Sequence, residues 1–271
     1  MKKRTSIVSR EYKVMLRAAK FAGDEAALLK TASAFWNDFA ASIQGEAIET
    51  SGALHSVAKR RRIQFFDTPS ADLTAAGYIF RVRGDLKGGR PEVTLKFRHE
   101  DRYFSESRRI DASVDDTEVK FEEDIKAPFV SLYSHSATAA IRKRDTPSDL
   151  TALARMFPSL SRRLDDADGT RPLSAIGGFT ARELVITGST VQIGRKPKVE
   201  AECALIVWYD DQNVGDAEAV EFSYRYGNRK EQYGGGPARR ACAVFKALQS
   251  LNAWIDPHPR TKTRFVLDKQ K

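Results

Sequence analysis

Alternation of apolar and polar residues is the main pattern along this 271-residue chain. Its period of two is typical of strands, whose successive side chains point to opposite faces of a sheet. Turn-forming residues separate several of the segments, as Gly88 and Gly89 do. The predicted strands cover residues 7–16, 63–66, 78–83, 93–98, 103–110, 182–193, 199–210 and 217–226, with a shorter one at 264–267. The pattern predicts a mainly β fold with antiparallel neighbours.

Two segments instead have the 3.6-residue period of an amphipathic helix. Residues 24–43 place an apolar stripe on one side, and Asp24 can cap the amide groups at the start. The second helix begins near Pro237 and stops before Pro257. Each stripe needs a surface to cover, so we expect both helices to pack on the outside of the sheet.

The chain has no internal repeat and no long linker, which predicts a single domain over residues 1–271. The stretch from about residue 111 to residue 178 lacks the alternation and holds a short helix between Ser148 and Pro158. We expect this stretch to be an irregular insertion.

The polar faces of the strands carry both basic and acidic residues, among them Lys13, Arg81, Lys96 and Glu221. Two interpretations stay open at this point. A sheet with one solvated face would explain the charges without any function. A closed barrel of roughly eight strands would instead enclose them, and enclosed cations persist only around acidic partners or a bound polyanion. Arginine suits phosphate because its planar fork donates two parallel hydrogen bonds.

The order of these segments resembles the CYTH superfamily, also called triphosphate tunnel metalloenzymes, which includes class IV adenylyl cyclases, thiamine triphosphatases and inorganic triphosphatases. The matching segments are QFFDTP at 64–69, FRVR at 80–83, VTLK at 93–96 and VEF at 220–222. The resemblance implies an α+β, mainly β fold, built as a closed antiparallel barrel with helices packed outside.

The resemblance also implies roles for individual residues. The expected phosphate-binding residues are Lys13, Arg81, Arg83, Lys96, Arg108 and Arg142. The expected ligands of Mg²⁺ or Mn²⁺ are Glu11 and Glu221, with Glu202 and Glu106 as further candidates, and the expected catalytic residues are Glu11, Lys13 and Glu221. Ser9 and Ser223 stand where the family has metal-side glutamates.

The function expected from this resemblance is metal-dependent hydrolysis of a small triphosphate, whether inorganic triphosphate, thiamine triphosphate or a nucleoside triphosphate. One alternative is a non-catalytic module that binds polyphosphate or a nucleotide. The other is a class IV-type adenylyl cyclase, which would use the same cationic grip on the phosphates.

Composition narrows the partners and the compartment. The net charge of +9 favours anionic partners. No nucleic-acid-binding module accompanies the basic run at 59–62, which is typical of a solvated strand edge, so nucleic acid is not the expected partner. No apolar run is long enough for a signal peptide or a membrane span, and Cys203 and Cys242 lack metal-ligand spacing. We therefore expect a cytoplasmic protein without membrane contact.

Overall fold

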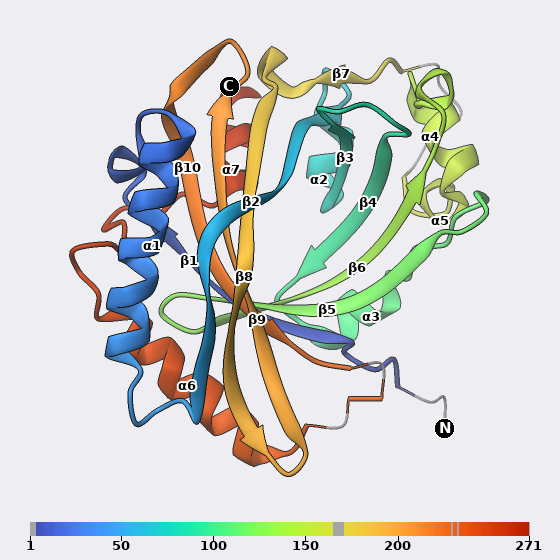
Figure 1. Ribbon diagram of the computed structural model, residues 1–271. Helices are drawn as coiled ribbons and strands as arrows, with labels where there is room; N and C mark the ends of the chain where they lie inside the picture. The colour runs from blue at the N-terminus through green and yellow to red at the C-terminus, as the bar shows by residue number, and fades with distance from the viewer. Residues whose placement is uncertain (1–3, 165–170, 229, 232, 271) are drawn as a thin grey trace.

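The computed structural model describes residues 4–164, 171–228, 230–231 and 233–270. Within these residues, one ten-stranded sheet bends into a ring (Figure 1). Its order is β3-β4-β6-β5-β1-β10-β9-β8-β2-β7, and a further pairing of β2 with β3 joins the two ends. The strands are β1 (Ser9–Leu16), β2 (Glu49–Asp67), β3 (Tyr78–Asp85), β4 (Glu92–His99), β5 (Glu118–Lys126), β6 (Val130–Ala140), β7 (Ser174–Ala175), β8 (Ala181–Arg195), β9 (Lys198–Asp210) and β10 (Asn213–Tyr226).

The closed, mainly β architecture is confirmed, with one correction to the strand directions. Neighbouring strands are antiparallel except for β1 and β5, which pair in parallel with Glu11 opposite Asp124. The chain crosses from β4 to β5 through a short helix and a loop, so it enters β5 in the same direction as β1.

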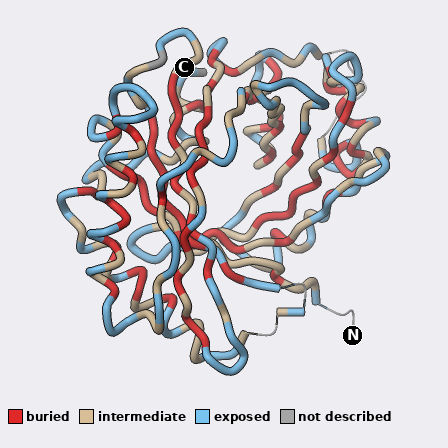
Figure 2. The backbone as a smooth tube through the Cα atoms, viewed as in Figure 1, coloured by how far each residue is buried: buried red, intermediate tan, exposed pale blue. Residues whose placement is uncertain are grey.

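Helices cover the outside of the ring, as expected, except for the last one, which packs against inward-facing residues such as Phe65 and Trp208. The helices are α1 (Glu25–Ser42), α2 (Asp72–Ala75), α3 (Arg102–Ser107), α4 (Leu150–Met156), α5 (Pro158–Ser161), α6 (Gly235–Gln249) and α7 (Lys262–Leu267), with short 3₁₀ turns η1 (Ala18–Phe21), η2 (Lys143–Asp145), η3 (Ile176–Gly178) and η4 (Asp268–Gln270). Asp24 caps α1 by accepting a hydrogen bond from the Ala27 amide at 2.9 Å. Figure 2 shows that the buried parts of α1 and α6 face the sheet.

Two of the apolar clusters hold the outer helices on the ring. The first joins Phe35 and Phe39 of α1 and Phe245 of α6 to strand residues such as Phe222. The second, on the opposite side, packs α4 and α5 against β3, β4 and β6 (Figure 1). Because the apolar strand faces are used outside, the charged faces point into the ring.

The stretch from about 111 to 178 is not an irregular insertion throughout. It contains β5 and β6, which lie side by side within the ring between β4 and β1. Its second half does hold the expected short helix, which is α4. The small polar residues of β6, with the sequence VSLYSHSATAA, hide the alternation that marks the other strands.

Two predicted strands are helices. Residues 103–110 begin as α3, because Asp101 caps its first turn by accepting from the Phe104 amide at 2.8 Å. Residues 264–267 belong to α7, where the Thr261 hydroxyl accepts from the Arg264 amide at 3.3 Å. In both cases a local cap outweighs a short alternating pattern.

Candidate anion-binding chamber

A cavity of about 500 Å³ lies inside the ring, and we call it the chamber. Its described lining contains more basic than acidic side chains. The basic residues are Lys13, Lys59, Arg61, Arg81, Arg83, Lys96, Arg98, Lys120, Lys126, Arg225 and Lys262, and the acidic ones are Glu11, Glu92, Glu118, Glu122, Glu183 and Glu221. The chamber therefore carries a net positive charge.

The QFFDTP segment, residues 64–69, positions the start of β3 through hydrogen bonds between a carboxylate and backbone amides. The buried Asp67 carboxylate accepts from the amides of Thr68, Leu73 and Thr74 at 2.7–2.9 Å, which fixes the turn around α2. Gly77 then turns the chain into β3 with a φ of +80°, where a Cβ atom would meet the Phe97 ring at 3.0 Å. This motif residue, Asp67, serves the fold and lies outside the chamber lining.

Arg81, Arg83 and Lys96 form what we call the cationic wall of the chamber, on β3 and β4. Arg81 lies opposite Thr94 in the register, and Lys96 lies opposite Ile79. Within the part of the chain that the structure describes, the Nε groups of Arg81 and Arg83 have no hydrogen-bond partner. Burial and the nearby Arg83 lower the pKa of Arg81 to about 9. Burial likewise lowers the pKa values of Arg83 and Lys96. The wall is thus short of negative charge.

On the facing strands, Glu11 and Asp124 are engaged by cations. Lys13 Nζ lies 2.8 Å from Glu11 and 3.1 Å from the buried Asp124, which also contacts Arg98 at 3.0 Å and Lys96 at 3.4 Å. Burial alone would raise the pKa of Asp124, but Lys13, Lys96 and Arg98 hold it well below its usual range. Sequence reasoning gave Asp124 no role, because it belongs to a short acidic run, residues 122–124, that is typical of a solvated surface and fell in the presumed insertion.

The short helix α7 adds a further cation that sequence reasoning missed. Lys262 Nζ lies 3.0 Å from a Glu221 carboxylate oxygen and 5.6 Å from the centre of the Trp208 ring. Val266 anchors the helix in an apolar cluster with Trp208 and Met15. Thr261 could have indicated this helix in the sequence, because a threonine side chain can cap the first turn of a helix.

Four of the predicted site residues lie elsewhere. Glu106 accepts from the Thr5 amide at 2.6 Å on α3, and Arg108 stacks on Phe104 with 4.9 Å to the ring centre. Arg142 is exposed and pairs with Asp145, and Glu202 pairs with Arg225 at the mouth of the ring. The chamber lining brings together Glu11, Lys13, Arg81, Arg83, Lys96 and Glu221 and does not include the other four.

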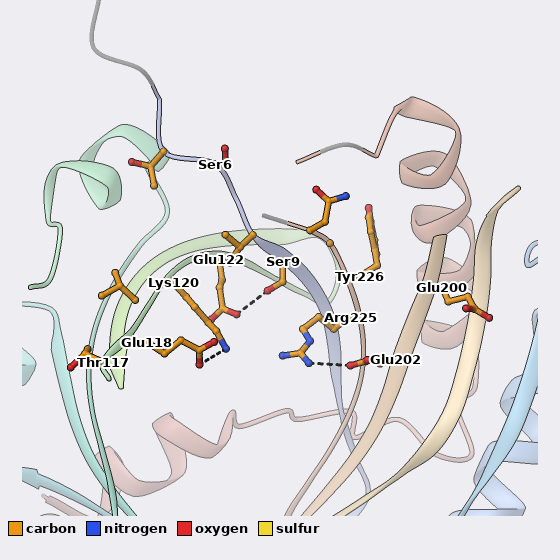
Figure 3. A pocket seen from close by; sticks show the side chains of 15 residues that line it. Ser6, Ser9, Thr117, Glu118, Lys120, Glu122, Glu200, Glu202, Arg225 and Tyr226 are labelled. Carbon is orange, nitrogen blue, oxygen red and sulfur yellow. Dashed lines mark hydrogen bonds and ion pairs between the residues drawn. The ribbon is translucent and has the colours of Figure 1, made fainter. Parts of the chain in front are cut away.

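A second cavity, of about 710 Å³, adjoins the chamber, and Figure 3 shows its side chains. Glu118, Lys120, Glu122 and Arg225 line both cavities, so we treat this one as the mouth of the chamber. The Ser9 hydroxyl donates to Glu122 at 2.8 Å, and Lys120 pairs with Glu118 at 2.8 Å. The mouth also holds Glu200 and Glu202, so it is more acidic than the chamber.

The residues as placed do not fit the expected Mg²⁺ or Mn²⁺ site. Glu11 and Glu221 both face the chamber, but each carboxylate is already paired with a lysine. In the described ranges, no group of three or more His, Cys, Asp or Glu side chains is placed to hold a metal ion. A hard divalent cation needs free carboxylate oxygens, and one oxygen of each of these two carboxylates already contacts an ammonium group.

Comparison with known proteins gives remote structural similarity only. No protein-family model and no curated protein matches the chain. A candidate adenylyl cyclase from Hippeastrum with a dominant triphosphatase activity is 12% identical, with 96% of this chain and 95% of that chain covered and a TM-score of 0.47. Candidate adenylate cyclases from Bacillus halodurans and Vibrio parahaemolyticus are 14% and 11% identical, cover 96% of this chain and 97% and 98% of their own, and have TM-scores of 0.39.

None of the helices in the described part of the chain is long and apolar enough to cross a membrane. The ring of strands, with helices outside and charged faces inside, agrees with the fold that the resemblance to the CYTH superfamily implies.

Proposed function

We propose that the chamber binds a triphosphate group, either as inorganic triphosphate or as part of a small molecule. The observation that carries this proposal is the cationic wall, in which Arg81 and Arg83 are buried with unpartnered Nε groups. Arg83 reaches only Glu92, at 3.5 Å, and Arg81 has no ion pair among the described residues. A buried cation without a close counter-ion is costly, and an anion that fills the chamber would remove that cost.

The chemistry of the wall suits phosphate better than a single carboxylate. The two arginines on alternate positions of β3 present forked donors, and Lys96 on the next strand presents a point charge beside them. Several cations spread along two strands match a chain of phosphates, whose charge is also spread along its length.

Hydrolysis of the bound triphosphate, expected from the resemblance, is the finer part of this proposal. Glu11 and Glu221 line the same chamber as the wall, and in this proposal they would orient a water molecule, with Lys13 beside Glu11. Both carboxylates are paired with lysines, so binding is the function that the geometry supports best. Hydrolysis of the bound triphosphate is tested in the experiment below.

The test is calorimetric titration of the purified chain with inorganic triphosphate, ATP and thiamine triphosphate, alongside assays for released phosphate and pyrophosphate. Arg81→Ala should weaken binding by about 10- to 150-fold, because a hydrogen bond to a charged group contributes about 1.5–3 kcal/mol. Arg62→Ala is the matched control, since Arg62 lies on the neighbouring strand but is half exposed and pairs with Asp211 outside the chamber.

Equal losses in the two variants would sink the proposal. Phosphate release lost in Arg81→Ala would add hydrolysis to binding, and pyrophosphate release with cyclic AMP would favour the cyclase.

A further inference from the structure

Two lysines occupy the carboxylates that a metal ion would need. Lys13 comes from the same strand as its partner Glu11, whereas Lys262 comes from α7, far along the chain from Glu221. The pair of Lys262 and Glu221 is largely buried, with 14% and 7% of the side chains exposed. An ion pair shielded in this way is screened little by salt and does not exchange readily with ions in solution.

We propose that the Lys262 ammonium group takes the place of a divalent cation beside Glu221, so that the chamber binds its anion without a metal ion. This inference rests on the proposed function in one respect, namely that the ligand is a triphosphate. It concerns Lys262 itself, a residue outside every motif that the sequence analysis singled out.

An ammonium group can perform the bridging role of a small cation. It is a compact charge with three donors, so one hydrogen bond to Glu221 leaves others for phosphate oxygens in the chamber. Lys262 lies in the chamber lining together with Thr261 and Thr263, and its ammonium group lies over the Trp208 ring. The helix thereby holds the charge in one position, as a coordination site would hold an ion.

Neighbouring residues also make a second cation unfavourable at this point. Lys126 lines the same chamber, and the Lys13 ammonium group already lies 2.8 Å from Glu11 and 3.1 Å from Asp124. Ser223 presents a neutral hydroxyl and hydrogen-bonds to Glu11, and Ser9 donates to Glu122. A divalent ion would enter a place already rich in positive charge and poor in free carboxylate oxygens.

The first measurement uses the unmodified full-length chain. Its affinity for inorganic triphosphate is measured by calorimetry in EDTA and in excess Mn²⁺, and Mn²⁺ alone is titrated with detection by electron paramagnetic resonance. We expect triphosphate to bind in EDTA at least as tightly as in excess Mn²⁺, which itself chelates triphosphate in solution, and we expect no saturable binding of Mn²⁺ alone. A requirement for Mn²⁺, or tight binding of Mn²⁺ alone, would overturn the inference.

The second measurement uses Lys262→Met, which keeps an unbranched side chain and removes the charge. In EDTA it should bind triphosphate about 10-fold or more weakly, by the loss of one charged hydrogen bond, and Mn²⁺ should restore part of that affinity. Lys269→Met is the control, because Lys269 also stacks on aromatic rings near the end of the chain but lies outside the chamber lining.

Failure of the inference and failure of the proposed function give different results. If no variant binds triphosphate under any condition, the proposed ligand is wrong, yet Mn²⁺ binding gained in Lys262→Met and not in Lys269→Met still supports the role of Lys262. Identical Mn²⁺ binding by all three proteins contradicts that role. The wild-type measurement in EDTA decides the matter even if Lys262→Met does not fold.

Discussion

The two sides of the chamber differ in how their charges are compensated. On the cationic wall, Arg81 has no ion pair among the described residues, Arg83 reaches only the half-exposed Glu92 at 3.5 Å, and Lys96 reaches Asp124 at 3.4 Å. On the facing strands, Glu11, Asp124 and Glu221 each have at least one cation within 3.0 Å or close to it. The chamber therefore lacks negative charge beside the arginines, while its carboxylates already have cations beside them.

The comparison also explains the directions of the pKa shifts. Burial and the neighbouring Arg83 lower the pKa of Arg81, since few anions oppose them. The pKa of Asp124 is lowered despite burial, because three cations surround it. A bound triphosphate would give the arginines of the cationic wall the opposite charge that they lack, whereas Asp124 already has opposite charges around it.

The largest expected effect comes from Asp124→Asn, which would leave Lys13, Lys96 and Arg98 without their shared carboxylate. Removing one partner of a buried ionic network costs about 3–5 kcal/mol, and we expect a loss of that size in the free energy of unfolding. Urea denaturation measures it. Asp145→Asn is the control, since Asp145 pairs with Arg142 at the surface and should change stability by less than about 1 kcal/mol.

Triphosphate should then stabilise Asp124→Asn more than it stabilises the wild type, because the ligand can neutralise the stranded cations. A loss in Asp124→Asn no larger than in Asp145→Asn would remove the contrast between the two sides of the chamber.

A smaller effect of opposite kind is expected for Arg81→Met. Without ligand, this variant should be as stable as the wild type or more stable by about 1 kcal/mol, because it removes a buried charge that lacks a partner while keeping an unbranched side chain. Thermal unfolding with and without triphosphate separates the two roles of the residue. Strong destabilisation of the ligand-free variant would show that Arg81 has a structural partner after all.

The smallest expected effect is on pH dependence. Burial and the nearby Arg98 lower the pKa of Lys126 to about 8, and Arg81 has a pKa of about 9. The unfolded chain therefore binds more protons than the folded chain above about pH 8, so the stability of the ligand-free protein should rise as the pH increases from 8 towards the ordinary lysine pKa. Bound triphosphate favours the charged forms, so its affinity should fall over the same range.

Thermal shifts at pH 7 and pH 9.5 measure this effect, and the shift caused by triphosphate should be smaller at the higher pH. In Lys126→Met, the difference between the two pH values should shrink. A triphosphate shift that grows with pH would contradict the assignment of these cations to the ligand.

Strands with regular alternation could be predicted from the sequence, since their side-chain direction depends on local parity alone. Parity also placed Glu11, Lys13, Arg81 and Lys96 on one face, and the structure has all of them in the chamber lining. The first half of β2 was missed because register shifts between Gly52 and Ser56, and between Val57 and Lys59, break its alternation.

Other parts of the site depend on contacts that no local pattern records. Lys262 reaches Glu221 only because an apolar cluster around Trp208 and Val266 docks α7 on the ring. Asp124 joins Lys13 through the parallel pairing of β1 with β5, and such a pairing leaves no mark on either strand. Arg108 and Arg142 share the residue type of true lining residues but lie on elements that face outward.

The pairing of β1 with β10 has a consequence for how the protein reaches its native state. Arg10 and Tyr226, which are partners in this pairing, are 216 residues apart in sequence. Contacts of such long range form slowly, because a large loop must close before they contribute to stability. During synthesis, one edge of β1 stays unpaired until β10 has been made. Glu11 and Glu221 therefore enter the same chamber only after the other strands have been synthesised. The chamber is therefore a late product of folding, and a nascent chain has no site until its ring closes.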